Sequence, residues 1–343
     1  MGNRGVRLNK CLSFDKSHYA VLDHVFRGHI DNLRAMCWME EDELLLTGGD
    51  ELDRTIKIWN LAAGGLIKTI EPHTWAVSDI VECRGTPNCF VSSSWDSTIK
   101  VWTKYGELKG ELVGHHRDVF CLASCGRKVA SGGLDGTIRI WDVDTFQQVA
   151  VLERHHSDIL ALKFKTEKYL ISSSNDCRLY IWNLETKNVV RDLHGYQDFI
   201  LCIQYCEKRD MMATGGSNCH ILIWDMKKWK PTQTLTKHKE AIMALDIDQE
   251  GNRLVSGADD KMILIWSLHT FECLHMLKGH TENITRIRIS QNGRRFISSS
   301  RDQTAKTWKI RVTVPEIMFL RHIKKNKVLA SLPYSLFREL MIY

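Results

Sequence analysis

Proline is scarce in this sequence, and long apolar runs are absent. Only 5 of the 343 residues are proline, which excludes the Pro-rich composition of many fibrous or disordered chains. No apolar run reaches the ~18 residues of a membrane-spanning helix, and no basic stretch followed by an apolar one opens the chain as a secretion signal does. With 43% hydrophobic and 26% charged residues, the chain is expected to bury a large core and to make no membrane contact.

Motifs that hold metals or carry out catalysis are also missing. The 11 cysteines are odd in number and scattered, and no two Cys-x-x-Cys pairs stand at zinc spacing. There is no phosphate loop, nucleophile elbow, His-Glu-x-x-His motif or kinase signature, and the glycine pairs Gly132-Gly133 and Gly215-Gly216 are expected in strand-to-strand turns. We therefore expect no catalytic residue, cofactor or metal, and free thiols suited to the cytoplasm or nucleus.

The positive charge is confined to the two ends of the chain. Residues 1–17 carry +3 and residues 309–343 carry +5, which leaves −2 of the net +6 for residues 18–308. A nucleic-acid-binding body would need a basic face. Nucleic acid is therefore an unfavoured partner, and only the basic ends keep it as an alternative.

One period organises most of the chain. Seven of the 11 tryptophans follow one another at intervals of 43, 39, 41, 42, 42 and 42 residues. Alternating stretches such as Thr-Ile-Lys-Ile-Trp precede them, as in half-buried strands. Each repeat also holds a His, a Ser or Thr, and an Asp, with Tyr196 and Asn218 as substitutes in the fifth. The recurring residues are His29, Thr47, Asp53 and Trp59; His73, Ser92, Asp96 and Trp102; His115, Ser131, Asp135 and Trp141; His155, Ser172, Asp176 and Trp182; Tyr196, Thr214, Asn218 and Trp224; His238, Ser256, Asp260 and Trp266; and His280, Ser298, Asp302 and Trp308.

These residues resemble the WD40 repeat, with its Gly-His start, Asp turn and terminal Trp. The literal Trp-Asp pair occurs only at Trp141-Asp142 and Trp224-Asp225. The resemblance covers about residues 19–310 and implies an all-β, seven-bladed propeller. The sequence up to Trp308 supplies only three strands of the last blade. Residues 19–27 are therefore expected to supply the fourth strand and close the ring. The expected parts are a basic extension over 1–17, the propeller over 18–310 and a short helical tail over 311–343.

The recurring polar side chains are expected to form one hydrogen-bonded chain in each blade. The Asp can accept from the His ring, the His can contact the Ser or Thr hydroxyl, and that hydroxyl can accept from the Trp indole. Leaving one such buried group unpaired costs about 1–3 kcal/mol, so the chain should fix the blade. Tyr196 and Asn218 replace both ends in the fifth blade, which is expected to be the least rigid.

The resemblance also implies which residues would bind a partner. In WD40 propellers the wide face is built from the residues three and five after the repeat His and the residue before the turn Asp. The partner-binding residues expected on this basis are Arg34, Trp95, Asp118, Phe120, Leu134, Asp158, Leu160, Phe199, Leu201, Met243, Asp259 and Arg301. Their apolar members between Trp95 and Leu201 would form an arc on blades two to five, or would instead turn inward and fill the channel.

Residues 311–343 do not continue the repeat. Ile317, Leu320 and Ile323 stand three apart, as on one side of a helix, and a basic run follows them. The order of these features resembles a SOCS box, the module that docks Elongin B/C and a cullin. The docking residues that this resemblance implies are Ile317, Leu320, Leu332, Pro333, Leu336, Phe337 and Leu340. Arg321 and Lys325 depart from the family pattern, and a basic amphipathic helix that packs on the propeller or lies on a membrane surface is the alternative.

Together these patterns predict a non-catalytic protein-interaction scaffold rather than an enzyme. If the tail is a SOCS box, the chain would recruit substrates to an Elongin/cullin-type ubiquitin ligase. The alternative is a general scaffold subunit of a multiprotein complex, in signalling or associated with RNA or chromatin, without a ligase link.

Overall fold

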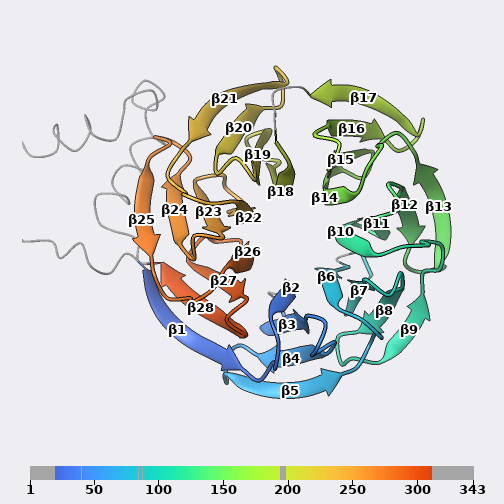
Figure 1. The fold of residues 1–343 in the computed structure, drawn as a ribbon, viewed down its shortest axis with the longest axis horizontal. Coiled ribbons are helices and arrows are strands. Elements are labelled where there is room, and N and C mark those ends of the chain that lie inside the picture. Colours follow the sequence, from blue (N-terminus) through green and yellow to red (C-terminus); the bar gives the residue numbers. More distant parts are fainter. Residues whose placement is uncertain (1–19, 40, 84, 87, 194–197, 311–343) are drawn as a thin grey trace, which may run out of the picture. The chain divides into compact units, whose positions relative to one another are not determined.

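A computed structural model of the chain describes residues 20–310, apart from 40, 84, 87 and 194–197 (Figure 1). Every regular element in these ranges is a β-strand, and Leu22–Lys309 form one compact unit. None of the described segments is a helix with the length and apolar character needed to cross a membrane. The basic extension over 1–17 and the tail over 311–343, with its seven expected docking residues, lie outside the described residues.

The described strands form seven four-stranded sheets, the blades, around a central axis (Figure 1). This arrangement confirms the expected all-β, seven-bladed class. From the innermost to the outermost strand, the blades are β2 (Leu33–Met39), β3 (Leu44–Gly49), β4 (Ile56–Asn60) and β5 (Gly65–Ile70); β6 (Val77–Glu82), β7 (Cys89–Ser94), β8 (Ile99–Thr103) and β9 (Leu108–Glu111); β10 (Val119–Cys125), β11 (Lys128–Gly133), β12 (Ile138–Asp142) and β13 (Gln147–Leu152); β14 (Ile159–Thr166), β15 (Tyr169–Ser174), β16 (Leu179–Asn183) and β17 (Asn188–Leu193); β18 (Ile200–Cys206), β19 (Met211–Gly216), β20 (Ile221–Asp225) and β21 (Lys230–Leu235); β22 (Ile242–Ile247), β23 (Arg253–Ala258), β24 (Ile263–Ser267) and β25 (Cys273–Leu277); and β26 (Ile284–Ile289), β27 (Arg295–Ser300), β28 (Thr304–Ile310) and β1 (Ala20–Arg27).

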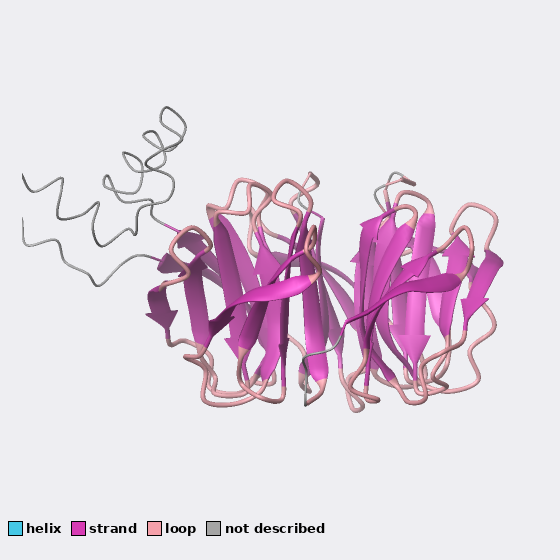
Figure 2. Ribbon diagram, turned by 90° about the horizontal axis from the view of Figure 1, so that it is seen from above, coloured by secondary structure: helices cyan, strands magenta, loops and turns pink. Residues whose placement is uncertain are grey.

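The hydrophobic core lies between neighbouring blades. Trp141, at the end of β12 in the third blade, packs with Val81 and Val91 of the second blade. Trp182 of the fourth blade packs in the same way with Ile140 of the third. Burying an aromatic side chain of this size removes about 150–250 Å² from water, so the repeated Trp is what holds each blade to the one before it. The turns that join the strands gather on two opposite faces (Figure 2).

The N-terminal strand completes the last blade. β1 pairs with β28 as the outermost strand of the seventh sheet. The backbone N–H of His24 donates to Thr307 Oγ1 at 3.0 Å, and Phe26 meets the Trp59 ring of the first blade edge-on at 5.6 Å between centroids. The strand thus pairs with β28 of the seventh blade and contacts the first blade, which joins the two ends of the ring.

The glycine pairs do not lie in strand-to-strand turns. Gly132 and Gly133 end β11, Gly215 and Gly216 end β19, and all four are buried. A Cβ atom on Gly133 would lie 2.0 Å from the carbonyl oxygen of Asp118. The turn prediction was wrong because the glycine is required here by the close approach of the neighbouring strand.

Deleting residues 1–27 should lower the melting temperature and promote aggregation, because β28 then becomes an unpaired edge. A loss of several kcal/mol corresponds to a drop of about 5 °C, since the shift per kcal/mol decreases as the chain becomes longer. Deleting residues 1–16 keeps β1 and should leave the melting curve unchanged. Differential scanning fluorimetry and light scattering on both variants measure this. Equal melting temperatures for the chain with and without β1 would mean that the ring is closed by another segment.

Candidate functional site

A directed chain of hydrogen bonds fixes the turns on one face of the propeller. In the third blade, His115 Nδ1 lies 2.7 Å from Asp135 Oδ2, His115 Nε2 lies 2.7 Å from Ser131 Oγ, and the Trp141 indole donates to the same Oγ at 2.8 Å. Four further blades have the same set of contacts. They are His29, Asp53, Thr47 and Trp59; His155, Asp176, Ser172 and Trp182; His238, Asp260, Ser256 and Trp266; and His280, Asp302, Ser298 and Trp308.

The second and fifth blades carry variants of this chain. In the second, His73 Nδ1 is 2.8 Å from Thr98 Oγ1 and 3.2 Å from Asp96 Oδ2, while Ser92 still joins the His to Trp102. In the fifth, Tyr196 lies outside the described residues. Trp224 still donates to Thr214 at 2.8 Å, and Asn218 Oδ1 still accepts the His220 N–H at 3.0 Å. The fifth blade therefore keeps its Trp contact and its turn bond.

The protonation states follow from burial and the partners. Burial opposes ionisation of Asp53, but hydrogen bonds from His29 and Thr55 outweigh it and hold the pKa of Asp53 below its usual range. Burial lowers the pKa of His29 even against the neighbouring carboxylate. A neutral His and an ionised Asp give one proton per contact: the indole donates to the hydroxyl, the hydroxyl to Nε2, and Nδ1–H to the carboxylate. The same directions hold for the pKa values of His155, His280, Asp96, Asp135, Asp176, Asp260 and Asp302.

The turn Asp also holds the two loops of the wide face together. In the seventh blade, Asp302 Oδ2 accepts the N–H of Thr281, the residue after the repeat His. The residue before the turn Asp is then bonded through its backbone to the residue three after the His. These backbone bonds run from Trp95 to Ala76, Leu134 to Asp118, Asn175 to Asp158, Ser217 to Phe199, Asp259 to Ala241 and Arg301 to Asn283. The positions expected to bind a partner are thus neighbours within each of these blades.

The first blade departs from this rule because Thr47 stands six residues before Asp53, rather than four as in the other repeats, so that two residues are inserted. Here the backbone N–H of Asp50 donates to the Asn32 carbonyl, so Asp50 takes the place that Leu52 would have had. Leu52 is pushed outward and is 73% exposed. The Asp50 carboxylate accepts two bonds from Arg34, at 3.0 and 2.9 Å. Arg34 is therefore a neutralised, fixed group rather than a free cation.

Three of the expected residues form a continuous row across the first three blades. The Arg34 guanidinium lies over the Trp95 ring at 4.1 Å from its centroid. Trp95 meets Phe120 of the third blade edge-on, with centroids 6.2 Å apart. All three side chains are partly exposed. A cation–π contact and an edge-on aromatic pair hold Trp95 in one orientation.

The remaining expected residues divide between the cavity and the rim. Leu160, Leu201 and Met243 line the central cavity and are partly exposed. Phe199 is 42% exposed. Leu134 is half-buried beside Asp118, and Asp158 Oδ2 lies 3.5 Å from the Asn175 amide. Asp259 is half-buried, and Arg301 is exposed.

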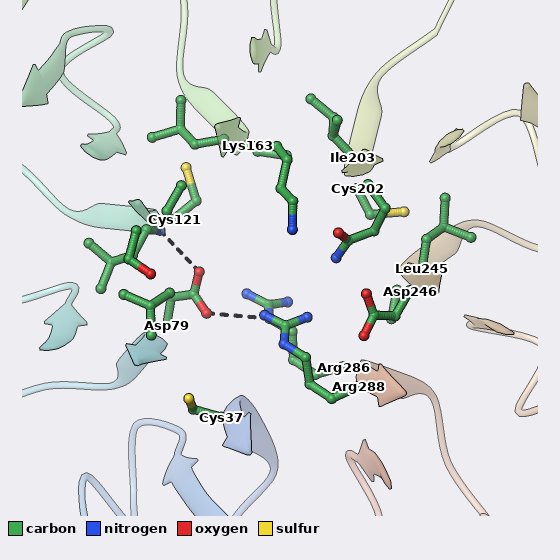
Figure 3. A pocket seen from close by; sticks show the side chains of 18 of the residues that line it. Cys37, Asp79, Cys121, Lys163, Cys202, Ile203, Leu245, Asp246, Arg286 and Arg288 are labelled. Atoms are coloured by element: carbon green, nitrogen blue, oxygen red, sulfur yellow. Dashed lines mark hydrogen bonds and ion pairs between the residues drawn. The ribbon is translucent and has the colours of Figure 1, made fainter. Parts of the chain in front are cut away.

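The central channel holds a cavity of about 470 Å³ that the sequence pattern did not suggest. Lys163 from one side and Arg286 and Arg288 from the other project into it, with Asp79 and Asp246 beside them (Figure 3). Arg286 Nε lies 3.6 Å from Asp79 Oδ1. Burial raises the pKa of Asp246 although Arg288 and Lys163 act against this.

The channel carboxylates join neighbouring blades. Asp79 Oδ2 accepts the N–H of Leu122 from the third blade at 3.0 Å, and Asp246 Oδ2 accepts the N–H of Ile289 from the seventh at 2.8 Å. Asp246 occupies the otherwise apolar strand β22, and that break in the pattern is the signal that could have identified it. Among the described residues, no group of three or more His, Cys, Asp or Glu is placed to hold a metal ion.

One exposed aromatic residue of this face was missed from the sequence. Trp75, two residues after the repeat His73, is 52% exposed, and Arg54 Nη1 of the first blade donates to the carbonyl of the adjacent Thr74 at 3.1 Å. It is one of four tryptophans outside the repeat positions, and a tryptophan without a place in the repeat is the feature that points to it.

Replacing Asp135 with Ala should reduce the free energy of unfolding by about 1–3 kcal/mol, because His115 and the turn N–H of Thr137 lose their acceptor. Asp260→Ala should cost a similar amount. Asn218→Ala should cost less, since its side chain accepts only the turn N–H of His220 among the described contacts. Urea unfolding monitored by tryptophan fluorescence gives the three values. Equal losses would contradict a stabilising role for the His–Asp contact.

Stability should fall as the pH is lowered from about 7.5 to about 5.5. The pKa values of His29, His155 and His280 are lowered in the folded chain, so the unfolded chain, with His pKa values near 6.5, binds more protons in this window. Each of the three histidines adds to the loss, because each must be protonated in the unfolded chain before it is in the folded one. Below about pH 4, protonation of the turn carboxylates adds a second loss, because their folded pKa values are depressed.

The melting temperature measured across this pH range tests the prediction. His280→Gln should flatten the slope, whereas His116→Gln, at an exposed site, should not. A slope unchanged by the His280 substitution would exclude the buried His as its source.

Comparison with known proteins agrees with the repeat. The family described as WD domain, G-beta repeat matches residues 21–60, 64–103, 106–142, 146–183, 187–225, 229–267 and 271–309. Each match ends one residue after a repeat Trp.

Similar curated proteins include nuclear distribution protein nudF of Aspergillus niger (30% identical, covering 52% of this chain and 42% of that protein). Small ribosomal subunit protein RACK1y of Oryza sativa subsp. japonica is 33% identical, over 43% of this chain and 45% of that protein. Pre-mRNA-processing factor 19 of the same plant is 26% identical, over 62% and 41%.

In each of these pairs the similar region spans less than half of the relative's length. The matched repeats nevertheless run through nearly the whole described part of this chain. The seven matched repeats correspond to seven sheets, five of which carry the full set of His, Ser or Thr, Asp and Trp contacts, and the chain belongs to the WD40 repeat family.

Proposed function

We propose that this chain is a non-catalytic protein-interaction scaffold that holds a protein or peptide partner on its wide face. The observation that carries the proposal is the row of Arg34, Trp95 and Phe120, held by contacts across three blades. Binding energy at protein interfaces is concentrated in a few aromatic and Arg side chains. Trp95 is already fixed before a partner arrives, so little conformational entropy is lost on binding.

The same contacts argue against catalysis by the repeat histidines. Both ring nitrogens of His115 are occupied, by Asp135 and Ser131, and the ring is buried. A general base must reach the proton that it removes. The other repeat histidines among the described residues are held in the same way.

The relatives support the general form of the proposal. Their names refer to nuclear distribution, a ribosomal subunit and pre-mRNA processing. Proteins with such different roles share the repeats with this chain, and a fold that serves different assemblies suits a binding platform. We place the protein in the cytoplasm or nucleus, since the cysteines of the described part are all free.

A ligase role is a second, narrower proposal that rests on the sequence of residues 311–343. In this proposal Leu332-Pro333 and the apolar end from Leu336 dock Elongin B/C, which brings a cullin, while the wide face selects the protein to be modified. These residues lie outside the described part of the chain, so the proposal depends on the resemblance to a SOCS box alone.

Trp95→Ala or Phe120→Ala should weaken partner capture by about 30-fold or more, the effect of losing one hot-spot side chain. Tyr105→Ala is the matched control: it is also an exposed aromatic, but it lies in the β8–β9 turn, at the opposite end of the blade from Asp96. Affinity capture with quantitative mass spectrometry compares the variants, and equal melting curves exclude unfolding. Capture that is unchanged by both wide-face substitutions would overturn the proposed site.

A chain ending at Arg311 separates the two proposals in the same experiment. It should retain the partners that depend on Trp95 and lose Elongin B and C if the tail is the docking module. If Elongin is absent from the captures of the full chain, or stays bound to the shortened one, the ligase proposal is wrong and the scaffold proposal is unaffected.

A further inference from the structure

The mouth of the central channel is apolar on one half only. The second residue of the innermost strand is Phe120, Leu160, Leu201 or Met243 in the third to sixth blades, and each is partly exposed. In the other three blades the same position is polar but engaged internally. Ser78 contacts Ser93 at 2.8 Å, Thr285 contacts Ser299 at 2.9 Å, and Arg34 is bound to Asp50. The apolar half of the mouth is therefore the part open to an apolar side chain.

Carboxylates stand directly outside this apolar half. Asp118 and Asp158 immediately precede the innermost strands of the third and fourth blades, and Asp259 precedes the turn Asp of the sixth. All three are half-buried. Within the described part of the chain, no Lys or Arg lies within ion-pair distance of them, and Asp259 Oδ1 is buried without a hydrogen-bond partner.

Three cations on the same face have partners other than these carboxylates. Arg34 is bound to Asp50, Lys261 is paired with Glu282 at 3.1 Å, and Arg54 donates to the Thr74 carbonyl. Arg117 and Lys239 are exposed residues of the loops ahead of β10 and β22. Arg301 is exposed on the seventh blade, at the polar half of the mouth.

The positions of these charged groups determine which partner can cover the mouth with the smallest loss of solvation free energy. A segment that covers half-buried carboxylates removes water from them, and that cost is recovered only if it brings cations to them. Lys and Arg can do this while their aliphatic stems lie along the apolar rim. An acidic segment would add like charge beside these carboxylates.

We infer that the wide face selects an extended basic peptide segment, with one apolar side chain at the channel mouth and Lys or Arg side chains directed to Asp118, Asp158 and Asp259. The inference rests on the proposed function and specifies its partner class. It also sets an orientation, since an acidic residue of the same segment would lie toward Arg301.

A random-peptide display library selected on the full-length protein tests the inference. Peptides that combine an apolar residue with neighbouring Lys or Arg should be enriched over acidic ones. Replacing Asp118, Asp158 and Asp259 together with Asn keeps the side-chain size, and should remove the preference for Lys and Arg while apolar enrichment remains. Glu107→Gln, at an exposed carboxylate in the β8–β9 turn, is the matched control and should leave the selection unchanged.

The best enriched peptide is then titrated by fluorescence anisotropy. Asp118→Asn alone should weaken it about 3- to 10-fold, and raising the salt concentration should weaken binding to the wild-type chain more than binding to the triple variant. Two results would overturn the inference and leave the proposed site standing. One is enrichment of neutral or acidic peptides that bind the wild-type chain but not Trp95→Ala. The other is a preference for basic peptides that persists in the triple variant. If no selected peptide loses binding in Trp95→Ala, both the inference and the proposed site are wrong.

Discussion

The contact between the repeat His and the turn Asp is the interaction on which the rest of the propeller depends. It lies at one end of a chain that begins at the Trp indole between blades and ends at the loop ahead of the innermost strand. Because each link carries one proton in one direction, a Trp packed on the preceding blade, as Trp141 is, also orients the turn of its own blade. Packing between blades and loop geometry on the wide face are therefore coupled through the same four side chains.

The inner strands add a second set of constraints near the axis. Their channel-facing edges would leave backbone N–H groups without partners, which is costly away from water. Asp79 and Asp246 satisfy two of these groups in the next blade. Arg286 of the seventh blade lies 3.6 Å from the carboxylate of Asp79 in the second blade, so its positive charge offsets the negative charge of the buried Asp79. The charges of the channel thus have a structural use before any ligand is considered.

The repeat made much of the fold predictable. Strand positions, the Trp at each blade interface and the recurrent His contacts follow from spacing, because the same side chains must meet in every blade. The closing strand followed from counting strands. The position of Arg34 could not be predicted, since it depends on how the insertion in the first repeat moves Asp50 into the turn. Spacing also gave no means of separating Leu160, which lines the cavity, from Phe120, which meets Trp95 across a blade boundary.

The asymmetry of the wide face shows where a propeller of similar blades acquires specificity. Side chains in the His–Asp chain cannot vary without loss of stability, whereas the backbone bond made by the residue before the turn Asp does not depend on its side chain. Side chains of different chemistry therefore occupy this position: Trp in the second blade, Asp in the sixth and Arg in the seventh. In the first, second and seventh blades the second residue of the innermost strand is polar and makes an internal contact, and in the third to sixth blades it is apolar. In the proposed function, a partner is therefore selected by the apolar half of the mouth and the carboxylates beside it.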